Sequence, residues 1–170
     1  MREVINDIRI VIGRELGAFQ REIELFPDDD LVWKTVPGVV NSAGNLALHV
    51  CGNLQFFVGA QLGDTGFVRN RELEFSRRSG TRAELVAGLR DTAEIVDSTL
   101  ARLSDDAFLR AMPEAKRGMV FEAHTFLIHL CAHTAFHLGQ AGYLRRALAG
   151  DSTSSGPMSL DELHAAVNES

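Results

Sequence analysis

The residues with the clearest chemical potential are histidines gathered between positions 121 and 148. Three of them, His129, His133 and His137, recur every four residues. Because this spacing stacks side chains along one face of a helix, the imidazoles form a polar row among largely apolar neighbours. An unpaired imidazole in an apolar core costs free energy, which a metal ion or a hydrogen-bond network offsets. The row therefore predicts a metal site.

Helix geometry ranks these histidines as ligands. At about 100° per residue, His133 and His137 lie about 40° apart, close enough for both rings to reach one ion. His129 falls at the edge of that face, about 80° from His137, and His124 lies roughly 180° from His133. A third ligand has to come from another helix, and His49 is the histidine in the other long helical segments.

Several polar residues are candidates for orienting a ligand or a substrate. Asn45 and Asn53 flank His49 at four-residue spacing and share its helix face, while Gln140 and Tyr143 follow His137. The alternatives are structural. A core histidine such as His49 is commonly bonded to a backbone carbonyl or water, Gln140 can join two helices, and Tyr143 can be a partly exposed aromatic side chain.

The chemistry of three neutral imidazoles suits zinc or nickel first, with iron, manganese or copper as alternatives, and leaves coordination positions for water or substrate. Thr134 follows His133, so the glutamate of the H-E-x-x-H protease motif is absent. Cys51 and Cys131 are rotated about 200° from His49 and His133, respectively, and we interpret both as core packing.

Composition narrows the class of protein. A chain of 170 residues fits one domain, and its net charge of −6 argues against binding to a nucleic-acid backbone. No apolar run reaches the roughly 20 residues that a membrane-spanning helix needs. The two cysteines lie in apolar runs, and the N-terminus has no signal-peptide pattern, so we expect reduced thiols in a cytoplasmic protein.

Four helical segments must position the histidines. Apolar periodicity and capping residues predict helices over residues 2–25, 42–62, 81–103 and 121–149, the third opening with Thr81 and Glu84 in capping-box spacing and the last ending at Gly150. The pattern indicates an all-α bundle.

The connections and the tail are less regular. The segment at 26–43, with Trp33, is either simple packing or one wall of the histidine pocket, and the segment at 63–80 is interpreted as a long surface connection that can serve as a lid. Residues 151–158 resemble a tether. Ser159 and Glu162 predict a short C-terminal helix that places His164 on the surface.

The segments NLALHVCGNLQFF and HTAFHLGQAGYLRR together resemble the DinB-like metal-binding helical-bundle superfamily, and RNRELEF resembles the segment that follows the second helix in some of its branches. The resemblance covers most of the chain. It implies a four-helix bundle with a long crossover over residues 1–150, followed by a tail at 151–170. It also implies a divalent metal held by His49, His133 and His137, a homodimer, and His129 as a neighbour of the site.

The resemblance implies a function as well. Some similar proteins transfer low-molecular-weight thiols or isomerise thiol adducts at the metal, and others have no assigned activity. We therefore expect a divalent-metal-binding protein that acts as a metal-dependent transferase using a small thiol. The alternatives are a metal-dependent hydrolase, a non-catalytic metal-binding or stress-related interaction protein, and a bundle whose histidines bind only water. No Asp or Glu near the histidines in the sequence is an obvious general base.

Overall fold

The computed structural model describes residues 1–114 and 118–169, and within them the regular structure is helical, apart from bridge residues such as the pair Ala111 and Glu122. The all-α prediction is confirmed. None of the helices in these residues is long and apolar enough to cross a membrane. Residues 115–117 of the predicted loop before the histidine-rich helix lie outside the described residues.

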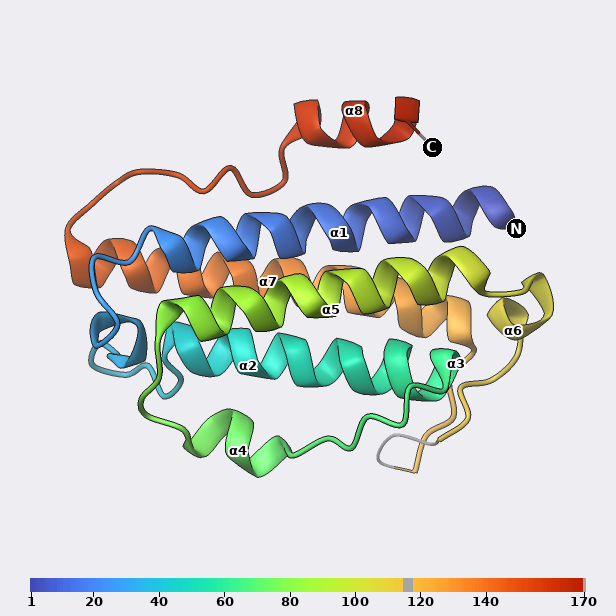
Figure 1. Ribbon diagram of the computed structural model, residues 1–170, viewed down its shortest axis with the longest axis horizontal. Coiled ribbons are helices and arrows are strands. Elements are labelled where there is room, and N and C mark those ends of the chain that lie inside the picture. The colour runs from blue at the N-terminus through green and yellow to red at the C-terminus, as the bar shows by residue number, and fades with distance from the viewer. Residues whose placement is uncertain (115–117, 170) are drawn as a thin grey trace.

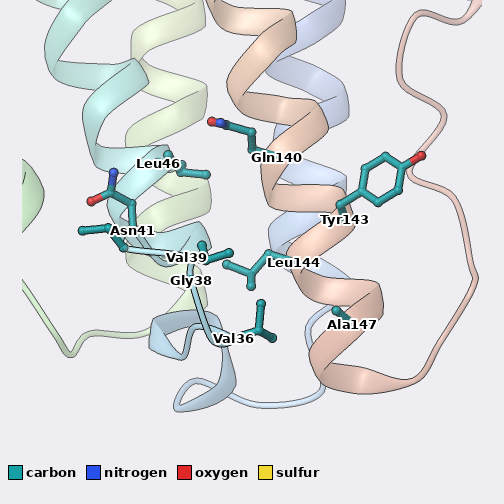
Figure 2. A pocket seen from close by; sticks show the side chains of 10 residues that line it. Val36, Gly38, Val39, Asn41, Leu46, Gln140, Tyr143, Leu144 and Ala147 are labelled. Carbon is teal, nitrogen blue, oxygen red and sulfur yellow. The ribbon is translucent and has the colours of Figure 1, made fainter.

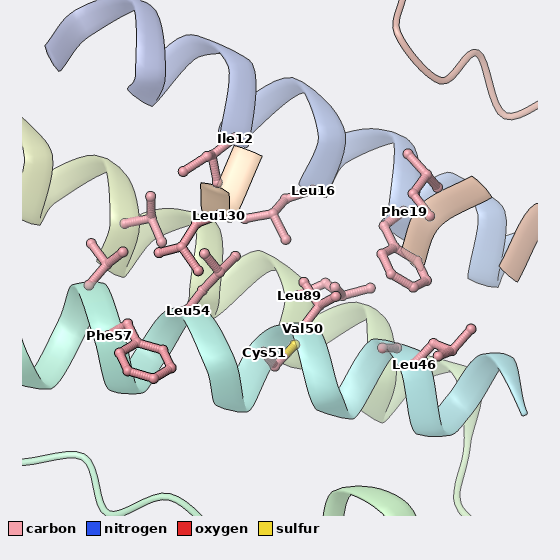
Figure 3. Close-up of a cluster of buried hydrophobic side chains, with 14 of the residues drawn as sticks. Ile12, Leu16, Phe19, Leu46, Val50, Cys51, Leu54, Phe57, Leu89 and Leu130 are labelled. Carbon is pink, nitrogen blue, oxygen red and sulfur yellow. The ribbon is translucent and has the colours of Figure 1, made fainter. Parts of the chain in front are cut away.

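Four long helical segments lie side by side and share one apolar core (Figure 1). Helix α1 packs on α5 and α7, and α2 packs on the same two helices. The core between them includes Ile12, Leu16, Leu54, Leu89 and Leu130, which point toward one another in Figure 3. The segments are α1 Arg2–Glu24, α2 Ala43–Leu54 with its extension, α5 Arg82–Arg102 and α7 Ala123–Ala149.

The extension of α2 departs from the predicted regular helix. A π-helical segment, Gln55–Ala60, follows α2 and leads into the short α3, Gln61–Gly63. The wider turn lets Phe57 and Val58 enter the core while the Gln55 amide donates to Thr92 Oγ1 over 2.8 Å. The segment thus adapts α2 to its packing against α5 immediately after the residues that flank His49.

Capping residues set the helix ends as their chemistry predicts. Ser42 accepts from the backbone of Asn45 and opens α2 in a capping box, and Thr81 and Glu84 form another at the start of α5. Gly150 ends α7 with a φ of 66°, a left-handed conformation that glycine adopts without strain.

The connections between the long helices contain short helices. The first, η1 Leu31–Trp33, buries Trp33 against α2, next to Gly44. The second, α4 Arg71–Ser76, lies across α2, so the long connection predicted at 63–80 contains a short helix. Asn70 caps α4 by accepting from the Leu73 backbone, a local signal that sequence periodicity alone misses. Ahead of α7, α6 Asp105–Leu109 packs on that helix.

The segment after α7 is bound to the long helices. Helix α8, Leu160–Glu169, lies along α1 in Figure 1 and contacts it. Arg145 is fully buried, pairs with Glu22 of α1 and donates to the Thr153 carbonyl. Arg21 donates to the Ser155 carbonyl over 2.9 Å. The predicted short helix is therefore present, and the predicted tether is anchored at Thr153 and Ser155.

Candidate metal centre

Three histidines from two helices meet between α2 and α7. Nε2 of His133 lies 3.3 Å from Nε2 of His49 and 3.1 Å from Nε2 of His137. All three ring nitrogens lie within 4.8 Å of one another. His49 is buried, and His133 and His137 are half-buried. The structure thus brings together the three residues that geometry and resemblance had selected.

The hydrogen-bond partner of His49 defines which of its nitrogens faces the cluster. Its Nδ1 lies 2.9 Å from Oε2 of Glu74. Burial alone raises the pKa of Glu74, but hydrogen bonds from Arg69 and His49 outweigh it and hold that pKa below 4.5, so the carboxylate is ionised and only accepts. Nδ1 of His49 therefore donates, and Nε2 presents a lone pair to the cluster.

The same logic applies to His137. Its Nδ1 lies 2.8 Å from the amide oxygen of Gln140, which can only accept, so Nε2 again presents a lone pair. Burial lowers the pKa of His137 below 6.5, with a smaller opposing effect from Gln140, and the ring is neutral at pH 7. Two lone pairs thus converge beside Nε2 of His133. A metal cation is the group that accepts several such pairs at once.

The distances fit such an ion. Nitrogens bound to one tetrahedral zinc at about 2.0–2.1 Å lie roughly 3.3 Å apart. The corresponding separations from Nε2 of His133 are 3.1 and 3.3 Å. Among the described residues, these three histidines are the group of His, Cys, Asp or Glu side chains close enough to hold an ion. Three protein ligands leave a tetrahedral ion with a position for an exogenous ligand.

Glu74 and Arg69, from the connection that includes α4, support the centre from outside. Arg69 Nε donates to Oε1 of Glu74 over 2.6 Å, and its Nη2 donates to Oε2 over 2.8 Å. These two hydrogen bonds from Arg69 hold the carboxylate in one orientation and favour its ionised form. Arg69 Nη2 also lies 3.2 Å from Nδ1 of His49, but both groups are donors, so the carboxylate between them holds the arrangement.

Gly52 makes room for this carboxylate on the surface of α2. A Cβ atom added at position 52 would lie 2.2 Å from Oε1 of Glu74, which is too close for a non-bonded contact. The glycine therefore lets Glu74 approach the helix backbone, one turn beyond His49. The need for a glycine at position 52 becomes clear only when the position of the connection between α2 and α5 is known.

Asn45 and Phe75 fix α4 over His49. The Asn45 side-chain amide donates to the backbone carbonyls of Glu74 and Arg77, each over 2.9 Å, while its oxygen serves the cap at Ser42. The ring of Phe75 lies 4.8 Å from that of His49 and covers it. Asn45 thus acts on His49 through α4, whose backbone it holds.

The remaining candidates occupy different positions. Gln140 contacts His137, as described above. Asn53 is buried on α2 with its side-chain oxygen unpaired in the described structure. His129 is exposed, and its ring lies 5.8 Å from that of His133, as a neighbour of the cluster. Tyr143 is exposed and stacks with Arg146. His124 packs against Phe108, away from the cluster, as its helix angle predicted.

The two cysteines are free and lie outside the cluster. Burial raises the pKa of Cys51 to about 12 and that of Cys131 to about 11. Both are therefore thiols at neutral pH, and neither is a nucleophile or a ready metal ligand. The interpretation of both as packing residues agrees with these positions.

The sequence-based view of the site missed Glu74 and Arg69. The sequence shows no acidic residue beside the histidines, yet the chain brings Glu74 to His49 across 25 residues. The carboxylate faces Nδ1, on the side away from the converging nitrogens, so it positions a ring and is not a general base for the open position. Both residues lie in the RNRELEF segment, whose resemblance to DinB-like proteins was the feature of the sequence that could have indicated them.

The fold and the site together define a class of protein, the DinB-like helical proteins, in which histidines from separate helices form a cluster that can hold a divalent metal. The chain belongs to the mycothiol S-transferase family, whose model matches residues 9–150. The matched region contains the three histidines, Glu74 and the whole connection between α2 and α5. The resemblance to the DinB-like proteins is thereby confirmed. No curated protein sequence matches the chain.

Proposed function

We propose that this protein is a metal-dependent S-transferase that moves a low-molecular-weight thiol onto an electrophilic carbon. The observation that carries the proposal is the convergence of the lone pairs of His49 and His137 on Nε2 of His133. Family membership supplies the reaction class, and the family name points to mycothiol as the thiol.

The role of each side chain follows from its position. His49, His133 and His137 would hold the ion, which would lower the pKa of a bound thiol so that it is a thiolate at neutral pH. Glu74 keeps His49 in the tautomer that donates from Nδ1, and Gln140 does the same for His137. In the transfer, a bond forms between sulfur and carbon while the bond from carbon to the leaving group breaks, and the thiol proton passes to solvent.

The alternatives receive less support. A purely structural or storage site is normally closed by a fourth protein ligand, and the described residues offer three. A metal-dependent hydrolase needs a base for its water. The carboxylate nearest the cluster, that of Glu74, is bound by Arg69 and faces away from the open position. A thiol needs no such base once it binds as thiolate.

The proposal extends to fold type, assembly, metal and location. We assign α1, α2, α5 and α7 to a DinB-type four-helix bundle whose long crossover contains α4, with zinc or nickel as the ion. We assign the protein to the cytoplasm, where small thiols are kept reduced.

We further propose a homodimer through α7, where Ile128 is 56% and Phe136 is 61% exposed. Light scattering of the purified protein and of Ile128→Glu tests this assembly, and an unchanged monomer mass contradicts it.

Metal analysis tests the site. The wild type should bind one equivalent of zinc or nickel, and His49→Ala and His133→Ala should lose it. His164→Ala is the matched control, because His164 is exposed on α8 and lies outside the cluster. Equal metal content in all four proteins contradicts the site.

Spectroscopy of the cobalt-substituted protein tests the transferase function separately. Titration with mycothiol should shift the ligand-field bands and add a sulfur-to-cobalt charge-transfer band, because the thiolate enters the open position. Conjugation of mycothiol to chlorodinitrobenzene should then depend on His133. If the ligand-field bands of the metal-loaded protein do not change on addition of thiol, the transferase proposal is wrong and only the proposed metal site remains.

A further inference from the structure

A groove runs from Gln140 along the C-terminal half of α7. It has a volume of about 530 Å³ and lies between α7 and the segment that precedes α2 (Figure 2). Leu46 and Leu144, both nearly buried, belong to its lining. The other lining residues are Val36, Gly38, Val39, Val40, Asn41, Gln140, Tyr143 and Ala147.

The lining has a distinct chemistry. It is largely aliphatic and contains no Lys, Arg, Asp or Glu, and its polar side chains are those of Asn41, Gln140 and Tyr143. Val40 is 83% and Tyr143 is 77% exposed, so apolar surface remains in contact with water. An uncharged ligand gains free energy by covering such surface, whereas a charged ligand loses hydration and finds no counter-charge.

The outer wall is formed by a defined turn. Gly38 has a φ of 83°, and the Val39 backbone donates to the Val36 carbonyl over 3.0 Å. Two residues after Val40, Ser42 begins α2 through its capping box. The segment is thereby tied at both ends, which makes the groove a formed site of the size that small ligands occupy, about 300–1,000 Å³. The segment at 26–43 thus forms a wall of this groove, whose lining includes Gln140 and none of the three histidines.

The groove is connected to the histidine cluster through one side chain. Gln140 lines the groove, and its amide oxygen lies 2.8 Å from Nδ1 of His137. In Figure 2 Gln140 lies at one end of the groove and Ala147 toward the other. A ligand lying along α7 can therefore have one end at Gln140, on the Nδ1 side of His137, and the rest of its body against Leu46, Leu144 and Ala147.

We infer that this groove binds the second substrate, an uncharged electrophile with an aromatic or short aliphatic body, and directs its reactive carbon toward the histidine cluster. The inference rests on the proposed transferase function and adds the class of acceptor to it. The sulfur of the thiolate attacks the electrophilic carbon, and the leaving group departs with its bonding electron pair. The concave shape and the contact of the lining residue Gln140 with His137 favour a small molecule over a second copy of the chain.

The test separates binding in the groove from metal chemistry. The probe is meta-dinitrobenzene, an uncharged aromatic compound without a leaving group, so that it binds and does not react. Its affinity for wild-type protein and for His133→Ala is measured by calorimetry, and its position by amide chemical shifts. We expect equal affinity for both proteins and shifts at residues 36–41 and 140–147. Failure of the metal site thus leaves this result intact.

Charge variants locate the site. Ala147→Glu and Val39→Asp should weaken binding of the probe by at least about tenfold, because each places a charge against an apolar ligand. Ala83→Glu is the matched control, because Ala83 is exposed on α5 outside the groove, and it should bind as the wild type does. Dinitrobenzoate, which adds a carboxylate to the same ring, should bind at least about tenfold more weakly than dinitrobenzene.

Three results overturn the inference: no saturable binding to the wild type, equal binding by Ala147→Glu and wild type, or shifts confined to other residues. If a second copy covers the groove, the probe does not bind the wild type, and Ala147→Glu lowers the mass in light scattering. In the metal-loaded enzyme, Ala147→Glu should raise KM for chlorodinitrobenzene and leave KM for the thiol unchanged. A rise in KM for the thiol instead assigns the groove to the other substrate.

Discussion

Oε2 of Glu74 lies 2.9 Å from Nδ1 of His49, and the same carboxylate receives two hydrogen bonds from Arg69. Glu74 belongs to the connection between α2 and α5, so the tautomer of one candidate ligand depends on a segment outside the long helices. The consequence is that α4 is part of the site. A substitution in α4, or in the surface of α2 against which α4 packs, should therefore change the affinity for the metal.

Replacement of Glu74 by Gln should weaken binding of zinc by about tenfold to a hundredfold, the usual effect of losing the carboxylate that orients a ligating imidazole. Competition with a chromophoric chelator measures the affinity. Glu72→Gln is the control, because Glu72 is exposed on the same helix. If both variants retain wild-type affinity, Glu74 contributes only to packing, and the positioning role is wrong.

The pH dependence of folding should report the Glu74 carboxylate in metal-free protein. Its pKa is below 4.5 in the folded state, so its hydrogen bonds stabilise the fold above about pH 4.5 and lose their effect as the pH falls through the folded-state value. The free energy of unfolding of wild type should therefore exceed that of Glu74→Gln by about 2 kcal/mol at pH 7. The difference should shrink at acid pH. A difference that is constant from pH 7 to pH 3.5 contradicts the assignment.

Gly52→Ala tests the close approach of Glu74 to α2. The added methyl group would lie 2.2 Å from Oε1 of Glu74, so the carboxylate must move and the contact with His49 must lengthen. We expect a loss of zinc affinity similar to that of Glu74→Gln. Gly13→Ala on α1 meets nothing within 4 Å and should stabilise the helix by up to about 1 kcal/mol. Full zinc affinity in Gly52→Ala would show that the carboxylate is not required where it lies.

The histidine cluster was predictable because most of its geometry is local. His133 and His137 share a helix face by their four-residue spacing alone, and His124 is turned away by the same arithmetic. Caps such as Thr81 with Glu84 are likewise local. The choice of His49 needed only the expectation that a second helix completes the site.

Glu74 and Arg69 were not predictable in the same way. Their contact with His49 spans 25 residues for Glu74 and depends on how the crossover returns to α2. A short helix such as α4 has too few turns to show a periodic pattern of apolar residues. In the sequence, a buried glutamate within a polar segment cannot be distinguished from a solvent-exposed one. Asn45 shows the related difficulty, since its polarity suggested a site residue and its hydrogen bonds hold the cap and α4.

The cysteines should be unreactive in the folded protein. Burial raises the pKa of Cys131 from 9.0 to about 11, which lowers its thiolate fraction at pH 8 by roughly a hundredfold, and Cys51 is more strongly shifted. Ellman's reagent should therefore react slowly with native protein and quickly with both thiols in guanidinium chloride. Fast reaction of either thiol without denaturant contradicts its burial. The result also matters for cobalt spectroscopy, since charge-transfer bands can then be assigned to the added thiol.

The last prediction concerns the pair that joins α1, α7 and the tail. Arg145 and Glu22 are 0% and 1% exposed, and Arg145 also donates to the Thr153 carbonyl. Arg145→Met leaves the Glu22 carboxylate buried without its partner, which should destabilise the fold by about 3–5 kcal/mol. Urea denaturation followed by circular dichroism measures this loss.

The companion variants separate charge from packing at this pair. Glu22→Leu with Arg145→Met removes both charges and should recover much of the stability, because no isolated charge then remains in the core. Arg146→Ala is the control, since that half-buried side chain stacks on Tyr143 near the surface. Arg145→Met should still bind zinc at low temperature, because its side chain pairs with α1 while His133 and His137 face α2. It should also release the chain after Gly150, which limited proteolysis detects. Loss of metal without loss of stability would show that this pair acts on the site and not on the fold.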